Sequence, residues 1–153
     1  MAQYLIGNFL DDPDATEIVV PTCGVFKRNG ELVMGAGAAK AAKLRFPGIQ
    51  HCEAFTRTPG RIHRYGAFIL QERGKRAIWA LQTKMDYRDD ADLELIDYSL
   101  ATIAPWMRDM PIVSMAYPGI GKGKLSKEDV QPLIEKHLGF LGDRLRVYDL
   151  EEK

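Results

Sequence analysis

Two glycine-rich segments are the parts of this sequence whose residue types and spacing point most directly to chemistry. The first glycine loop, residues 33–40, reads Val-Met-Gly-Ala-Gly-Ala-Ala-Lys and runs into an alanine-rich helical pattern. The second glycine loop, residues 117–123, reads Tyr-Pro-Gly-Ile-Gly-Lys-Gly and follows an apolar run typical of a strand. Glycine lets the backbone approach a ligand closely, and the first turn of a helix presents free N–H groups to anions. Both loops therefore indicate phosphate binding.

Each loop by itself also has a plain structural interpretation. The first could be a tight strand-to-helix turn whose glycines relieve crowding, and the second could be an ordinary loop. Neither is a dinucleotide fingerprint, because the third glycine of GxGxxG is missing. Neither is a Walker A loop, because no Ser or Thr follows Gly121-Lys122-Gly123. Two such loops in one small α/β domain, one of them at the carboxyl end of a strand, favour a ligand with more than one phosphate.

The residues that most often bind metals are few and scattered. They are Cys23, Cys52, His51, His63 and His137. The cysteines lack CxxC spacing and the histidines show no ligand spacing, so we expect no metal site. Cys23 is expected either to pack as a small buried side chain or to contact the ligand.

The composition is that of one globular domain over residues 1–153. Hydrophobic residues make up 46% of the chain and charged residues 27%, which is enough for one packed core. The 21 Lys and Arg residues balance the 21 Asp and Glu residues, which argues against a generic duplex-DNA binder but leaves room for a local basic patch. We expect no membrane span and no secretory signal, because long apolar stretches and a basic leader are both lacking. A cytoplasmic protein is expected.

Short apolar runs and helical patterns alternate along the chain. Runs rich in β-branched and aromatic residues predict strands at 4–6, 17–20, 67–70, 77–81, 112–116 and 145–148. Helical patterns occupy 36–46, 49–55, a stretch from Leu93 that ends near Pro105-Trp106, and the residues after Ser126. Pro132 is expected to kink this last helix or to delay its start to near Gln131. Unbroken apolar strands are covered on both faces, so we predict an α/β fold, a three-layer α/β/α sandwich with a mixed sheet of about six strands.

Two segments between these elements carry further signals. In residues 26–31, the pair Asn29-Gly30 is a strong two-residue turn signal, so this segment is predicted to form a hairpin flap. Residues 57–64 form the one dense basic run. We expect this run to be a solvated loop or, alternatively, a track for a nucleic-acid backbone.

Taken together, these residues resemble the macrodomain family of ADP-ribose binders. The resemblance is carried by residues 33–39, by Arg45-Phe46-Pro47 and by residues 119–123, and the order of elements agrees from Gly7 to Leu150. The nearest branch contains the terminal ADP-ribose protein glycohydrolase and the antitoxin macrodomains that remove ADP-ribose from DNA. In that branch a Thr-Lys pair follows the central strand, and this chain has Thr83-Lys84 there.

The resemblance implies ADP-ribose as the ligand and no cofactor. The first glycine loop would wrap the distal ribose, and the second would cradle the diphosphate. Asn8 would accept a hydrogen bond from the adenine amino group, and Tyr148 would lie against the adenine, unless it is a core tyrosine of the last strand. The ligand-binding residues implied in this way are Asn8, Phe9, Thr22, Cys23, Met34, Gly35, Ala36, Gly37, Pro118, Gly119, Ile120, Gly121, Lys122, Gly123 and Tyr148.

Lys84 is the candidate catalytic residue. A lysine at the end of a strand is ordinarily a surface charge, but the resemblance implies a nucleophile that attacks the anomeric carbon of a linked ADP-ribose. This chain departs from the branch in its second loop, which carries lysines where the branch has an acid. Asp86 could replace that acid or could lie in a solvated loop.

The sequence leaves more than one function open. The first is an enzyme that hydrolyses an ADP-ribose linkage on protein or nucleic acid. The second is a reader module that binds ADP-ribose without turnover, and a more remote third is a phosphatase acting on ADP-ribose 1″-phosphate. The expected partners are ADP-ribose or an ADP-ribosylated protein or nucleic acid, with no membrane, and a monomer is compatible with the sequence.

Overall fold

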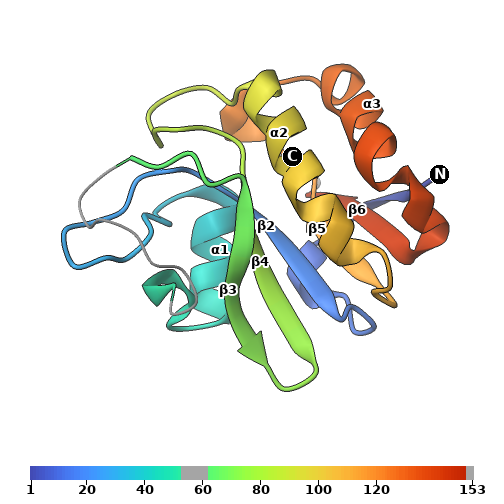
Figure 1. Ribbon diagram of the computed structural model, residues 1–153, viewed down its shortest axis with the longest axis horizontal. Coiled ribbons are helices and arrows are strands. Elements are labelled where there is room, and N and C mark those ends of the chain that lie inside the picture. Colours follow the sequence, from blue (N-terminus) through green and yellow to red (C-terminus); the bar gives the residue numbers. More distant parts are fainter. Residues whose placement is uncertain (53–61, 151–153) are drawn as a thin grey trace.

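A mixed β-sheet forms the centre of the molecule. The computed structural model describes residues 1–52 and 62–150, and in this part of the chain six strands pair in the order β1-β6-β5-β2-β4-β3 (Figure 1). The strands are β1 (Gln3–Ile6), β2 (Glu17–Thr22), β3 (Ala67–Arg73), β4 (Arg76–Gln82), β5 (Val113–Ala116) and β6 (Leu145–Asp149).

The direction of these strands determines where a ligand site can form. β1, β6, β5, β2 and β4 are mutually parallel, whereas β3 and β4 form an antiparallel hairpin. The carboxyl ends of the parallel strands therefore lie along one edge of the sheet, which is where ligands bind in open α/β sheets. Because neighbouring strands lie about 4.8 Å apart, the ends of β1 and β4 are separated by about 19 Å along this edge.

Helices cover both faces of the sheet. α1 (Gly37–Arg45) packs on one face, and α2 (Leu93–Met107) and α3 (Lys127–Leu138) pack on the other (Figure 1). Ile18 and Val20 of β2 belong to the core on the α1 side, whereas Val19 belongs to the core on the side of α2 and α3. Consecutive apolar residues thus serve two cores. The predicted three-layer α/β/α sandwich with a mixed sheet is confirmed.

Side-chain caps begin two of the helices. The Asp92 carboxylate accepts hydrogen bonds from the first turn of α2, and the Ser126 hydroxyl accepts one from the first turn of α3. Because α3 begins at Lys127, the alternative of a start delayed by Pro132 is wrong, and the helix accommodates this proline in its interior.

Two local predictions need correction. In the described part of the helix predicted over 49–55, residues 49–52, there is a 3-10 turn, η2 (Ile49–His51), in place of an α-helix, and Cys52 after it adopts a left-handed backbone (φ 55°). The hairpin over 26–31 is present, since Phe26 pairs with Leu32, but its turn is longer than two residues. The other short 3-10 helices are η1 (Phe9–Asp11), η3 (Gly121–Gly123) and η4 (Gly139–Arg144).

Two further observations concern the described residues only. None of their helices combines the length and apolar character needed to cross a bilayer. Most of the basic run 57–64, with residues 53–55 of the predicted helix, lies outside the described residues.

Candidate functional site

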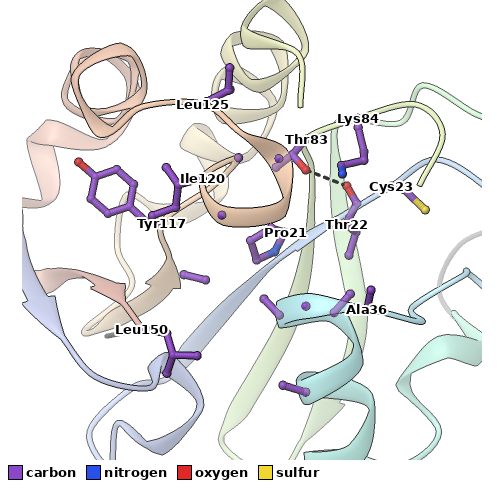
Figure 2. Close-up of a pocket in the computed structure, with 18 of the residues that line it drawn as sticks. Pro21, Thr22, Cys23, Ala36, Thr83, Lys84, Tyr117, Ile120, Leu125 and Leu150 are labelled. Carbon is purple, nitrogen blue, oxygen red and sulfur yellow. Dashed lines mark hydrogen bonds between the residues drawn. The ribbon is translucent and has the colours of Figure 1, made fainter. Parts of the chain in front are cut away.

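A cavity of about 1170 Å³ opens at the carboxyl edge of the parallel strands. The two glycine loops line it from opposite sides. In Figure 2, the N-terminus of α1 at Ala36 faces the arch of chain that carries Ile120. The lining takes in residues at or just after the carboxyl end of each of the five parallel strands, among them Asn8, Thr22, Lys84, Ala116 and Tyr148.

The first glycine loop leads into α1 without a side-chain cap. Ala36 is the N-cap residue and has an extended backbone (φ −153°, ψ 162°), but its methyl group cannot accept a hydrogen bond. The first turn carries no acidic residue either. Its N–H groups, which lack partners inside an α-helix, therefore remain available to an anion at the positive end of the helix dipole. A Cβ added at Gly35 would meet no atom within 4 Å, so this backbone is open to the cavity.

The second glycine loop is fixed against the segment that precedes α2. Gly119 (φ 80°) and Gly121 (φ 67°) adopt a left-handed backbone, which favours glycine. The carbonyl of Gly123 accepts a hydrogen bond from the N–H of Ala91 at 3.0 Å. A Cβ at Gly123 would lie only 2.9 Å from the Cβ of Ala91, whereas a Cβ at Gly121 would enter open space. The loop is thus packed on one side and open on the other.

At the end of the cavity formed by β1 and β6, a buried carboxylate fixes the ring of Tyr148. The Tyr148 hydroxyl donates to Asp12 Oδ2 at 2.7 Å, and Arg146 donates to the same carboxylate at 2.9 Å. Burial alone would raise the pKa of Asp12, but these hydrogen bonds outweigh it and the net pKa lies below its ordinary value. Burial and the Asp12 hydrogen bond raise the pKa of Tyr148 to about 12. Tyr148 is therefore a neutral, oriented aromatic side chain in the cavity wall.

Asn8 lies at the same end. Its side-chain oxygen accepts a hydrogen bond from the Leu10 N–H at 2.9 Å and so caps η1. The carbonyl that the sequence assigned to a base is thus already hydrogen-bonded within the protein. The amide nitrogen adds a donor at this end of the cavity.

At the opposite end, β2 and β4 bring Thr22, Cys23, Thr83 and Lys84 together. The Thr83 hydroxyl donates to the Thr22 carbonyl at 3.3 Å, and the half-buried Lys84 side chain extends toward Thr22 in the cavity (Figure 2). The Cys23 thiol donates to the Val33 carbonyl at 3.5 Å, and burial raises its pKa. Cys23 is therefore a buried neutral thiol that also lines the cavity.

Asp86, the candidate replacement for the missing acid, has another role. Its carboxylate accepts hydrogen bonds from the backbone N–H of Arg88 at 2.9 Å and from the guanidinium at 2.6 Å, which lower its pKa to about 2. Asp86 thus holds the turn that leads to Arg88, and it is not part of the cavity lining. The acidic residues that do line the cavity here are Asp89 and Asp90. Asp90 lies 3.7 Å from the Lys124 ammonium.

The structure brings most of the predicted site residues to one cavity. Those that line it are Asn8, Phe9, Thr22, Cys23, Gly35, Ala36, Gly37, Lys84, Gly119, Ile120, Gly121, Gly123 and Tyr148. The Met34 side chain is instead buried in the core beneath α1, and Pro118 is not part of the described lining. The Lys122 side chain lies outside the described part of the structure. Within the described ranges, no three His, Cys, Asp or Glu side chains are grouped as a metal site.

Several charged and aromatic residues of the cavity were not predicted from the sequence. They include Tyr87, Arg88, Asp89, Asp90, Lys127 and Asp149. Four of them form a charged and aromatic run, Tyr87 to Asp90, that begins three residues after Lys84 and precedes the helical pattern that starts at Leu93. Their place after the carboxyl end of a strand was the signal that could have identified them.

Comparisons with solved structures identify the fold. The structure matches the macrodomain of Thermus aquaticus DarG, with 23% identity and a TM-score of 0.74, over 99% of both chains. It matches the macrodomain of Mycobacterium tuberculosis DarG with 25% identity and a TM-score of 0.75, again over 99% of both. It also matches Thermosipho africanus DarTG, a complex with ADP-ribose, with 18% identity and a TM-score of 0.72, over 96% of this chain and 41% of that one.

No family model and no curated protein matches the sequence. The structural likeness covers almost the whole chain, with both glycine loops on one cavity at the carboxyl edge of the sheet. The predicted resemblance is therefore confirmed: this chain is folded as a macrodomain, and the DarG macrodomains are among its structural neighbours.

Proposed function

We propose that this protein binds ADP-ribose in the cavity between its two glycine loops. The observation that carries the proposal is that two glycine loops line one cavity from opposite sides. Two phosphates joined to each other would occupy the space between the loops, and a nucleoside and a sugar would extend toward the two ends. The DarTG structure that holds ADP-ribose supports this ligand.

The two ends of the cavity differ in a way that fits the two halves of ADP-ribose. The oriented ring of Tyr148 and the amide of Asn8 suit a nucleobase, because an aromatic ring offers a stacking surface and an amide offers directional hydrogen bonds. Thr22, Cys23 and Lys84 lie at the other end, where the distal ribose would sit. In this orientation the Lys84 nitrogen would approach the anomeric carbon.

We further propose that the protein hydrolyses an ADP-ribose linkage on protein or nucleic acid, with Lys84 as the nucleophile. The Lys84 amine would form a bond to the anomeric carbon while the bond to the departing group breaks, and the departing group would take up a proton. Water would then release ADP-ribose and regenerate the amine. Asp89 and Asp90 are carboxylates of the cavity wall that could exchange these protons.

A reader module without turnover is the second candidate. The observation that favours it is the second glycine loop, which carries lysines where the related hydrolases have an acid. Asp86 is engaged by Arg88 and does not compensate. Binding and hydrolysis share one cavity and differ only in chemistry.

Calorimetry and a turnover assay test the two levels of this proposal separately. Calorimetry with free ADP-ribose is expected to show saturable one-to-one binding by the wild type and by Lys84→Ala. Incubation with ADP-ribosylated protein and ADP-ribosylated DNA is expected to release ADP-ribose with the wild type and not with Lys84→Ala. No binding would refute the ligand. Binding without release from either substrate would favour the reader, and release by Lys84→Ala would remove the lysine from the mechanism.

A further inference from the structure

We infer that Gln82 is a positioning residue that holds the Lys84 backbone so that the Lys84 amine meets the distal sugar. The inference rests on the proposed function, because it assumes a sugar beside Lys84. Its basis is the set of hydrogen bonds made by the Gln82 side chain at the end of β4.

The Gln82 side chain is completely buried, and both of its polar atoms are bonded. Its Oε1 accepts hydrogen bonds from the backbone N–H groups of Tyr65 at 2.8 Å and Gly66 at 3.0 Å. Its Nε2 donates to the carbonyl of His63 at 2.8 Å and to the carbonyl of Lys84 at 3.3 Å. One amide therefore joins the segment before β3 to the candidate nucleophile.

The backbone on both sides of Lys84 is also held. The Thr83 N–H donates to the Thr22 carbonyl at 2.9 Å, and the Met85 carbonyl accepts from the Gly24 N–H at 2.8 Å. The Gln82 amide supplies the bond to the carbonyl of Lys84 itself. The Lys84 side chain consequently leaves a clamped stretch of chain rather than a free loop.

The residue type at position 82 is informative. The preceding residues of β4, Ala80 and Leu81, are apolar and completely buried, and an apolar side chain would satisfy packing there. Burying an amide is unfavourable unless its polar atoms are bonded. A glutamine at this place therefore does what an apolar residue cannot, which is to fix the direction in which the chain leaves the strand.

The inference requires a readout of the Lys84 amine itself, and reductive trapping provides one. Free ADP-ribose opens to an aldehyde at its distal sugar. An amine held beside that carbon condenses with the aldehyde, a C=N bond forms, and water leaves. Cyanoborohydride then delivers a hydride to give a stable secondary amine, which mass spectrometry assigns to a residue. The trapping rate at saturating ADP-ribose measures reach and orientation separately from affinity.

The informative variant is Gln82→Glu, which keeps the acceptor toward Tyr65 and replaces the donor toward Lys84 by an oxygen. When its carboxyl group is protonated, its single O–H can donate to the carbonyl of Lys84 or to that of His63, whereas the ionised form donates to neither and repels both carbonyls. We expect the rate relative to the wild type to be highest at low pH, where one of the two donor bonds can form, and to fall by about 10- to 100-fold as pH rises, since displacements near 1 Å have effects of this size. The affinity for ADP-ribose is expected to stay within a few-fold.

Ser99→Ala is the matched control. The Ser99 hydroxyl donates to the backbone carbonyl of Gln82 at 2.7 Å and is equally buried, but it does not bond the Gln82 side chain. It is expected to lower the unfolding temperature without changing the trapping rate or its pH dependence. If Gln82→Glu does not fold, Gln82→Met keeps the length without polar atoms and is expected to trap slowly at every pH.

The outcomes separate this inference from the function on which it rests. If the wild type does not bind ADP-ribose, the proposed function fails. If the wild type binds but traps nothing on Lys84, both the positioning role and the assignment of Lys84 as the nucleophile are refuted, whereas ADP-ribose binding stands. If Gln82→Glu traps at the wild-type rate at every pH, the positioning role alone is refuted. A parallel loss of affinity and trapping would also refute it, because the residue would then merely support the cavity.

Discussion

At Gly35 in the first glycine loop, an added Cβ would enter open space. At Gly123 in the second, it would lie 2.9 Å from Ala91, and at Gly119 it would lie 2.8 Å from Ile96. The first loop is thus open toward the cavity, whereas the second uses two of its glycines to pack against the protein. Of the second loop's glycines Gly119, Gly121 and Gly123, only Gly121 faces open space.

The two loops also differ in how their backbone is held. The carbonyl of Gly119 accepts from the Leu125 N–H at 2.9 Å and that of Gly123 from Ala91 at 3.0 Å, so the second loop is closed on itself and on the chain before α2. The first loop ends at a helix N-terminus that has no side-chain cap, unlike α2 and α3. Glycines in two similar motifs are therefore required for different reasons. Those at packed positions avoid a clash with the protein, and only those at open positions indicate space for a ligand.

The largest effect is expected for Gly121→Glu. A carboxylate at this open position would face the diphosphate, and like-charge contact of this kind costs several kcal/mol, which corresponds to at least about a 100-fold loss of affinity. Calorimetry with ADP-ribose measures it. Gly74→Glu is the matched control, because Gly74 has the same left-handed backbone (φ 60°) and open surroundings but lies between β3 and β4. Equal affinity in both variants would remove the second loop from the site.

Gly123→Ala is expected to act on stability. The added methyl group would overlap Ala91, and overpacking of this kind costs about 1–3 kcal/mol in the free energy of unfolding. Chemical denaturation measures the change. Ala91→Gly in the same chain is expected to recover part of the loss by removing the opposing methyl group. Strict additivity of the two changes would contradict the packing role.

Ala36→Asp is expected to change stability and binding in opposite directions. The carboxylate would cap α1 and stabilise the protein by about 1 kcal/mol. It would also occupy the N–H groups and repel a bound anion, which lowers affinity by about tenfold or more. Ala36→Ser, which caps without the charge, should give a smaller loss of affinity. A stabilised variant with unchanged affinity would show that the N-terminus of α1 is not a ligand contact.

The smallest effect is expected for Gly35→Ala. Nothing in the protein opposes the new methyl group, so the free energy of unfolding should change by less than about 0.5 kcal/mol. Affinity for ADP-ribose should fall by about fivefold, because the methyl group enters space that the ligand uses. Denaturation and calorimetry on the same preparation separate the two quantities. A loss of stability without a loss of affinity would contradict this prediction, because it would mean that Gly35 packs against the protein and does not face the ligand.

The short apolar runs were sufficient to predict the sheet, because β2 and its neighbour β5 are buried on both faces and consist mostly of apolar residues. What the sequence could not indicate was the end of short elements. The left-handed backbone of Cys52 interrupts the second predicted helix, although cysteine carries no preference for that conformation. Pro132 proved compatible with a helix whose cap at Ser126 lies well before it.

The glycine motifs were sufficient to predict both walls of the cavity, because a local pattern describes a local loop. The segment Tyr87–Asp90 was missed because its place in the lining depends on how the chain folds back between β4 and α2. Asp86 shows the same limit from the other side. Its position two residues after Lys84 suggested a catalytic acid, but its carboxylate is hydrogen-bonded to Arg88 and does not line the cavity.

The N-terminus of α1, which has no side-chain cap, has a consequence for how the sequence of this protein can diverge. Main-chain N–H groups are the same in every residue except proline, so a wall built from them places few demands on which amino acids surround it. Chains that differ at three quarters or more of their positions thus share one fold. Natural variation should therefore accumulate around the rim and leave the backbone path of the two walls unchanged.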